Sequence, residues 1–257
     1  MQKILPVLFF THARTRLACE ALRRVVERLD TSPYEKHYVV CHDHSSADHV
    51  DALREVLKGQ GRKSFLCPEG RGLGASMNRG ISFAVDDLGC DVFFRMEDDW
   101  LLERHLPVGG WASLMLVDAI AAIRMGMMYR ESSELVPYKS GLLRLKSRRD
   151  RTYNFNNQVA MVHRCAHDVA GMYDESLGAQ DCERDFAARF NAATEKGVIS
   201  PYVCWPEAWA RNCQDSPALP FIHAGFSELG HSFRVPNRYR YLNDIPERKA
   251  KEFDPDE

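Results

Sequence analysis

Short apolar runs rich in β-branched and aromatic residues alternate with stretches of helical periodicity over the first 100 residues. The runs are ILPVLFF (4–10), HYVV (37–40), SFLC (64–67) and DVFFRM (91–96). After the first run, apolar residues recur at helical spacing: Leu17, Ala21, Leu22, Val25, Val26 and Leu29. Helices are also expected over 47–57 and around 81–85. Because strands that alternate with helices form a parallel sheet covered by those helices, the sequence predicts an α/β fold.

The pattern is looser after residue 100. Apolar periodicity predicts helices over 111–123 and 183–193, and strands are expected near 125–130, 141–146 and 158–163. The segment 244–257 is charged and broken by prolines, which is typical of a mobile tail.

Composition narrows the class of protein. The chain has 257 residues, of which 45% are hydrophobic, so it can bury a sizeable core. A formal net charge of −2 argues against nucleic acid as a partner, because nucleic-acid binders carry a basic excess. Eight cysteines at irregular intervals, without a CxxC pair, indicate mostly reduced thiols that fill the core. No apolar run is long enough to span a membrane, so we expect a cytoplasmic protein without an integral membrane segment.

Three consecutive acids, Glu97, Asp98 and Asp99, directly follow the fourth apolar run. In an open parallel sheet, ligands bind at the carboxyl ends of the strands. Neighbouring carboxylates repel one another there unless a cation neutralises them, and Mg²⁺ or Mn²⁺ prefers such oxygen ligands together with substrate phosphates. The acids therefore indicate half of a site for a metal ion and a diphosphate. The alternative is an acidic turn in contact with solvent.

Three segments together resemble motifs of the GT-A glycosyltransferases, especially those of the large family 2. They are VVCHDHSSAD (39–48), the glycine-rich GRGLGASMNRGI (70–81) and MEDDW (96–100), which resembles the DXD motif in a Glu-Asp-Asp variant. Their order and spacing also match. The resemblance implies a GT-A, Rossmann-like fold: a mostly parallel sheet flanked by helices, with a smaller acceptor-side region. It divides the domain into a nucleotide-sugar-binding part (1–100) and an acceptor-binding part (101–243).

The resemblance also assigns roles on the nucleotide side. It implies that Thr11 and Arg14 lie beside the nucleotide, and that Asp43 accepts a hydrogen bond from a base N–H, typically that of uracil. It places Asn78 near the diphosphate or the sugar. Two departures leave the nucleoside and the sugar open: His44 stands where the second Asp of the turn is usual, and Met77 where an Arg often precedes the Asn.

The three acids take separate roles in the same resemblance. Glu97 is expected near the ribose, Asp98 is expected to help position the donor, and Asp99 is expected to bind Mn²⁺ or Mg²⁺. Trp100, which adjoins them, is the tryptophan that we expect to stack on a sugar ring.

The acceptor half contains two weaker matches. AQDCERDFAARF (179–190) resembles the acidic helix start that supplies the base in inverting members, which makes Asp181 or Glu183 the candidate base. Asp181 is favoured because it follows GAQ at the expected junction of loop and helix. The alternative is a run of acids stabilised by the helix dipole. FIHAGFSELGHS (221–232) resembles a late strand that ends in His, which makes His223 a candidate metal ligand, with a core or surface histidine as the alternative.

The histidine-rich segment 37–49 also raises the possibility of zinc. It holds His37, Cys41, His42, His44 and His49. Alternate residues of a strand point to opposite faces, and the spacing fits no compact four-ligand pattern. Zinc is therefore disfavoured.

The resemblance thus implies a metal-dependent, inverting glycosyltransferase of hexosyl or N-acetylhexosaminyl type. Its donor would be a nucleoside-diphosphate sugar, with UDP favoured, and its acceptor a glycan, a small molecule or a lipid-linked molecule. One alternative is a nucleotidyltransferase that makes an activated sugar, but the segment FFTHARTR (9–16) lacks the glycines of its phosphate loop. The other is a non-catalytic sugar-binding or scaffold domain on the same fold.

Overall fold

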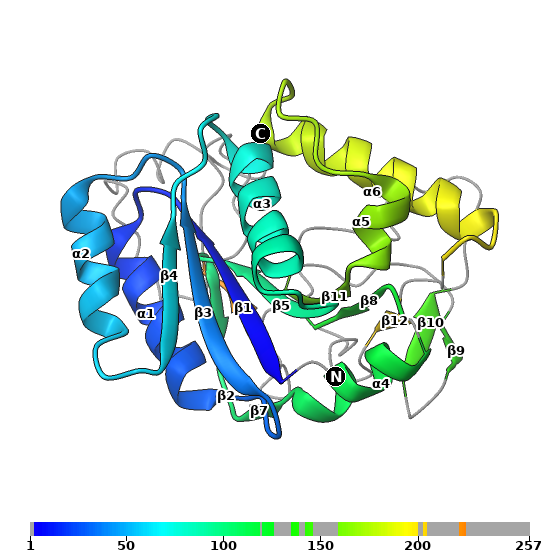
Figure 1. The fold of residues 1–257 in the computed structure, drawn as a ribbon, viewed down its shortest axis with the longest axis horizontal. Coiled ribbons are helices and arrows are strands. Elements are labelled where there is room, and N and C mark those ends of the chain that lie inside the picture. The colour runs from blue at the N-terminus through cyan, green and yellow to red at the C-terminus, as the bar shows by residue number, and fades with distance from the viewer. Residues whose placement is uncertain are drawn as a thin grey trace, which may run out of the picture.

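The computed structural model describes residues 3–118, 120–125, 135–138, 142–145, 159–199, 203–204 and 221–224. Within these residues the main sheet has nine strands in the order β4-β3-β1-β5-β11-β8-β12-β10-β9 (Figure 1). The charged segment 244–257 lies outside the described residues.

The N-terminal half of this sheet is parallel. Strand β1 (Ile4–Thr11) lies between β3 (Glu35–His42) and β5 (Val92–Glu97), and β4 (Arg62–Leu66) forms the edge beyond β3. All three pairings are parallel. The four predicted strands and their parallel arrangement are therefore confirmed. Because they are parallel, the carboxyl ends of β1, β3 and β5 lie at the same end of the sheet.

Helices cover both faces of the sheet. On one face, α1 (Thr15–Arg28), α2 (Ala47–Val56) and α4 (Gly109–Asp118) contribute to a core that includes Phe9 and Phe94. On the other face, α3 (Leu73–Ser82), α5 (Cys165–Ala170) and α6 (Ala179–Glu195) pack with Leu8 and Phe93. Neighbouring residues of β1 and of β5 thus enter opposite cores, as the alternation of a strand requires. The π-helical turn η1 (Phe83–Asp87) extends α3.

The C-terminal half of the sheet is mixed. Strand β11 (Ala160–His163) runs antiparallel to both β5 and β8 (Ala122–Arg124), and β12 (Val203–Cys204) is parallel to β8. The edge is formed by β10 (Leu143–Leu145) and β9 (Leu135–Pro137), which are antiparallel to each other.

Two expectations for this half are wrong. The helix expected over 111–123 ends at Asp118, and residues 122–124 form a strand that is buried on both faces. A short, wholly apolar run has no periodicity that separates a buried strand from a buried helix. The last helix begins at Ala179, four residues before the expected start at Glu183.

Two short pairings complete the described structure. Strand β2 (Leu29–Asp30) is parallel to β7 (Leu106–Pro107), and β6 (Trp100–Leu102) is antiparallel to β13 (Phe221–His223). Trp100 is only 2% exposed and packs in the core, so the expectation that it stacks on a sugar ring is wrong. Among the described helices, none combines the length and the apolar character needed to cross a membrane.

Replacing Gly109 with alanine is expected to destabilise the protein. A Cβ at this first residue of α4 would overlap the backbone carbonyl oxygen of Ser32. Relief requires a backbone shift, and overpacking of this kind costs about 1–3 kcal/mol. Thermal unfolding should therefore show a midpoint lower by roughly 2–4 °C per kcal/mol. Gly110→Ala is the matched control, because a Cβ there meets nothing within 4 Å. Equal midpoints for the two variants would contradict the expectation.

Candidate active site

Asp98 joins the ends of β1 and β5. Its backbone N–H donates to the carbonyl oxygen of Phe10 at 2.9 Å. Its Oδ2 accepts hydrogen bonds from the Thr11 hydroxyl at 2.7 Å and from the His12 backbone N–H at 3.2 Å. The Asp98 side chain is buried, and burial raises its pKa although Arg14 acts in the opposite direction. Asp98 therefore holds the loop after β1 against the acidic turn.

Arg14 supplies the cation that faces this turn. Its guanidinium forms an ion pair with Asp98 and a second one with Oδ2 of Asp99 at 3.0 Å. Burial opposes its charge, but Asp98 and Asp99 outweigh burial and raise the pKa of Arg14 above its usual value. A cation at the start of a helix is unfavourable with the helix dipole, and Arg14 is the N-cap residue of α1. The acids explain why an arginine occupies that position.

Glu97, the last residue of β5, lies in an environment that disfavours its charge. It keeps partial exposure to solvent, yet desolvation raises its pKa well above the usual range. The carboxylates of Asp99 and Glu183 raise it further, while Arg95 and Arg14 act in the opposite direction. Negative charge is therefore in excess at the end of β5.

Asp43 lies at the carboxyl end of β3. Its backbone N–H donates to the carbonyl oxygen of Thr11 at 3.2 Å, and its Oδ2 accepts from the backbone N–H of Gly72 at 3.0 Å. Gly72 has φ +96°, a conformation that suits glycine at the start of α3. The other carboxylate oxygen, Oδ1, is buried and accepts no hydrogen bond from the described residues. That oxygen is a ready acceptor for a ligand N–H.

The histidines of 37–49 have separate structural roles. His49 lies between two hydroxyls, 2.9 Å from Thr11 Oγ1 and 2.9 Å from Thr15 Oγ1. His37 contacts the Ser64 hydroxyl at 3.0 Å, and His44 contacts the Gly70 carbonyl oxygen at 3.0 Å. Sequence reasoning considered His49 only as a disfavoured zinc ligand, whereas in the structure it supports Thr11.

Helix α6 brings Glu183 toward the acids. Glu183 is partly buried, and its charge acts on Glu97. The charge of Glu183 also acts on Arg95 and Tyr173. Burial is the largest influence on the pKa of each of these two residues, and the interaction between them comes next. Asp181 is exposed instead, with 67% of its side chain accessible, and pairs with Arg184 at 3.4 Å. Of the two candidate bases, Glu183 is the one that lies near the acidic turn.

Arg95 and Tyr173 are site residues that sequence reasoning missed. Arg95 is 1% exposed on β5, and its Nη1 donates to the Tyr173 hydroxyl at 2.8 Å. Burial is the first cause that raises the pKa of Tyr173, to about 12. An arginine inside the apolar run DVFFRM was a usable signal, because a buried guanidinium requires a partner. Nothing in the sequence identified Tyr173 as that partner.

The late segment around His223 reaches the acidic turn through its backbone. His223 pairs with Trp100 in the β13–β6 ladder, and the N–H of Ala224 donates to the carbonyl oxygen of Asp99 at 2.7 Å. The His223 side chain lies outside the described residues, so its role as a metal ligand stays a prediction.

The donor atoms at the turn fit a hard divalent cation. In the part of the chain that the structure describes, no three His, Cys, Asp or Glu side chains come together as a metal cage. Mg²⁺ and similar ions bound with a nucleotide need only one or two protein carboxylates, because phosphates and water complete the shell. Desolvation is the first cause that raises the pKa of Glu97. The carboxylates of Asp99 and Glu183 raise it further, and the guanidiniums of Arg95 and Arg14 do not offset this increase. Asp99, with its oxygen donors at the edge of the sheet, is the residue that would hold the ion.

Comparison with solved structures shows which fold the chain has. No protein-family model and no curated protein matches the sequence. Residues 1–349 of TarS from S. aureus, also solved with UDP and with UDP-GlcNAc, match with a TM-score of 0.58 at 12% identity. That match covers 79% of this chain and 58% of the TarS fragment.

Two further solved structures have the same fold. The mannosyltransferase PcManGT from Pyrobaculum calidifontis, in complex with GDP-Man and Mn²⁺, matches with a TM-score of 0.51 at 14% identity, over 79% of this chain and 56% of that one. GalNAc-T7 with UDP, GalNAc and Mn²⁺ matches with a TM-score of 0.56 at 13% identity, over 80% of this chain and 43% of that one. The nine-stranded α/β domain, with its acids at the carboxyl end of β5, has the GT-A fold of glycosyltransferases.

Proposed function

We propose that the chain is a metal-dependent glycosyltransferase that moves a sugar from a nucleoside-diphosphate sugar to an acceptor hydroxyl with inversion. The observation that carries this proposal is that Glu183 of α6 lies close enough to Glu97, at the carboxyl end of β5, for its charge to raise the pKa of Glu97. The candidate base on α6 and the candidate metal ligand in the acidic turn therefore lie on the same side of the domain.

The nucleotide side rests on Asp43 and the acidic turn. The buried Oδ1 of Asp43 is an acceptor for a base N–H, as uracil offers. Thr11 and Arg14 lie between Asp43 and the acids, where a nucleotide would bind. Glu97 would accept from a ribose hydroxyl. TarS has been solved with UDP and GalNAc-T7 with UDP, which favours UDP over other nucleotides for this chain.

The chemistry needs a proton acceptor and a stabilised leaving group. The acceptor oxygen forms a bond to the anomeric carbon, the bond from that carbon to the diphosphate breaks, and Glu183 takes the acceptor proton. Asp99 would hold a divalent cation, which would supply positive charge for the leaving diphosphate. Arg14 contributes positive charge on the same side.

Glu183 suits the role of base better than Asp181. A base needs a position beside the reacting groups, and the exposed Asp181 is paired with Arg184 instead. We propose a hexosyl or N-acetylhexosaminyl donor, because TarS has been solved with UDP-GlcNAc and PcManGT with GDP-Man. We propose a glycan, a small molecule or a lipid-linked molecule as acceptor, presented from the acceptor side of the domain.

Thermal unfolding with nucleotides tests the proposal. The protein is heated with UDP, GDP, CDP or TDP, each with and without Mn²⁺. A nucleotide at about a hundred times its dissociation constant adds roughly 2.7 kcal/mol to stability. We expect UDP to raise the midpoint by several degrees, at about 2–4 °C per kcal/mol, and only with Mn²⁺ present.

The other outcomes discriminate among the alternatives. A metal-dependent shift with another nucleotide would keep the transferase and change the donor. Folded protein with no shift for any nucleotide would favour the sugar-binding or scaffold reading. Pyrophosphate release from UTP and a sugar phosphate would favour the nucleotidyltransferase.

A further inference from the structure

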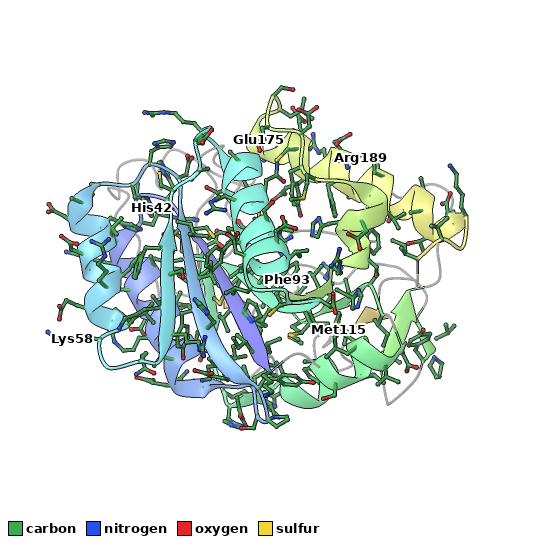
Figure 2. The ribbon with its side chains drawn as sticks, in the orientation of Figure 1. His42, Lys58, Phe93, Met115, Glu175 and Arg189 are labelled. Carbon is green, nitrogen blue, oxygen red and sulfur yellow. The ribbon has the colours of Figure 1, made fainter. Side chains whose placement is uncertain are left out.

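The loop 171–178 joins α5 to α6 and lies against α3. Figure 2 shows Glu175 of this loop at the same end of the molecule as His42, which ends β3. A Cβ on Gly74 of α3 would lie 3.4 Å from the carbonyl oxygen of Asp174 and 3.6 Å from Cβ of Tyr173. The glycine-rich start of α3 therefore packs closely against this loop.

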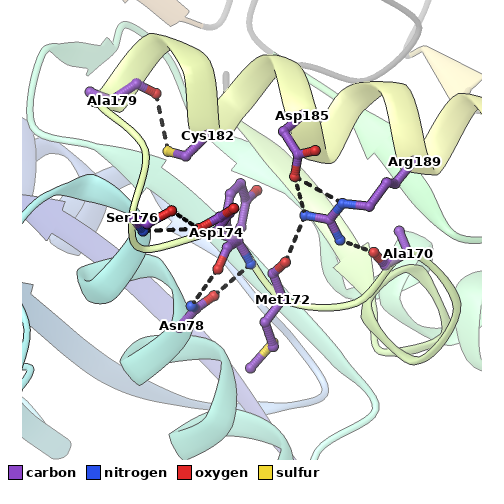
Figure 3. A network of polar contacts seen from close by, with 10 residues as sticks. Asn78, Ala170, Met172, Asp174, Ser176, Ala179, Cys182, Asp185 and Arg189 are labelled. Atoms are coloured by element: carbon purple, nitrogen blue, oxygen red, sulfur yellow. Dashed lines mark hydrogen bonds and ion pairs between the residues drawn. The ribbon is translucent and has the colours of Figure 1, made fainter.

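Asn78 binds the loop with every donor that it has. Its Nδ2 donates to the carbonyl oxygen of Tyr173 at 2.9 Å and to Oε1 of Glu175 at 2.8 Å. Its Oδ1 accepts from the backbone N–H of Tyr173 at 2.9 Å (Figure 3). An amide has two N–H groups, and a phosphate or a sugar-diphosphate oxygen needs a donor. Asn78 has none to offer while these contacts persist.

Tyr173, which Asn78 holds in place, also contacts the elements that carry Glu97 and Glu183. Its hydroxyl accepts from Arg95 on β5, two residues before Glu97. Its ring stacks on Phe186 of α6 with the ring centroids 4.5 Å apart, and Phe186 lies three residues after Glu183 on the same helix. Asn78 thus fixes a tyrosine that contacts both the strand of Glu97 and the helix of Glu183.

Arg189 anchors the other end of the loop. Its Nη2 donates to the carbonyl oxygen of Met172 at 2.7 Å, and its Nη1 binds that of Ala170. Asp185, one helical turn earlier, accepts from its Nε at 2.9 Å and orients it (Figure 3). The loop is held from α3 and from α6, so the start of α6 has a fixed position.

We propose that Asn78 is a positioning residue that sets Glu183 against Glu97 through Tyr173, and that it does not bind the donor. This proposal rests on the proposed function in assigning Glu183 as the base. The contacts of Asn78 explain why the amide stands in the glycine-rich segment without contacting the nucleotide.

The experiment compares Asn78→Ala with the wild type in donor affinity, turnover and loop exchange. Affinity is measured by calorimetry with UDP and Mn²⁺, and turnover as release of UDP from UDP-GlcNAc with water as acceptor. We expect an unchanged dissociation constant and a turnover lower by about 10²-fold, because a misplacement near 1 Å has effects of that size. Hydrogen exchange in 171–183 should accelerate. Ser176→Ala is the loop control and should match the wild type, since among the described residues Ser176 hydrogen-bonds to Asp174 within the loop.

Two results would overturn the proposal. Weaker UDP binding with unchanged turnover would make Asn78 a donor ligand, and unchanged exchange in 171–183 would remove its positioning role. If Asn78→Ala fails to fold, Tyr173→Phe takes its place, because it removes only the hydroxyl that accepts from Arg95. If the wild type neither binds UDP nor releases it, the proposed function is refuted instead. Hydrogen exchange of 171–183 in Asn78→Ala would then still test whether Asn78 fixes the loop.

Discussion

Replacing Glu183 with glutamine is expected to lower turnover of a UDP-sugar by about 10²–10⁴-fold, the usual contribution of a general base. Glutamine keeps the size of the side chain but cannot take the acceptor proton. Binding of UDP and Mn²⁺ should stay within about twofold of the wild type, because a base acts in the transition state rather than on donor binding. UDP release in steady state, together with calorimetric titration of UDP, measures both quantities.

Asp181→Asn separates the two acids at the start of α6. Its side chain faces solvent and pairs with Arg184, so its loss should leave turnover near that of the wild type. If Asp181→Asn inactivates the protein while Glu183→Gln does not, the base is Asp181, and Glu183 acts only on the electrostatics of Glu97. If neither variant changes turnover, the inverting mechanism with an acidic base from α6 is excluded.

Replacing Asp99 with asparagine is expected to abolish the part of the UDP stabilisation that depends on Mn²⁺. The amide oxygen is a weaker ligand than a carboxylate for a hard cation, and the acidic turn loses a negative charge. The full shift of roughly 2.7 kcal/mol at a hundredfold excess of UDP should therefore disappear. Thermal unfolding with UDP and with or without Mn²⁺ provides the measurement.

Asp98→Asn is the matched control for that experiment. Asp98 binds Thr11, His12 and Arg14, so its replacement should lower the unfolding midpoint of the ligand-free protein. Asp99→Asn should lower that midpoint less, because the Asp99 side chain is more exposed than that of Asp98, at 12% against 1%. A full metal-dependent shift in Asp99→Asn would show that the cation binds elsewhere.

The parallel half of the fold could be predicted from the sequence, because each of its elements has a pattern within a short stretch of the chain. Each strand is a short apolar run, each helix has an apolar stripe, and the acids come directly after β5. The antiparallel half was not, because Ala122 and Ile123 continue the apolar run 119–123, whose pattern fits a buried helix as well as a buried strand.

The candidate site divides in the same way. Glu97, Asp98 and Asp99 are adjacent in the sequence, so their proximity needed no structure. The contacts of Asn78 with Tyr173 and Glu175 join residues far apart in the chain, and no local pattern encodes them. The choice between Asp181 and Glu183 likewise depends on which side of α6 faces β5, which the packing of Phe186 against Tyr173 decides.

The pairing of β13 with β6 has a consequence for how the protein is made. Residues 221–224 are the partner of the strand that follows the acids, and the backbone of Asp99 receives its hydrogen bond from Ala224. Contacts between distant parts of a chain form late, because the loop between them must close first. During synthesis on the ribosome, the parallel sheet can assemble while this segment is still untranslated, and the acidic turn is completed only after residue 224 has emerged. A nascent chain halted before that point would hold a nearly finished sheet with an unfinished acidic turn.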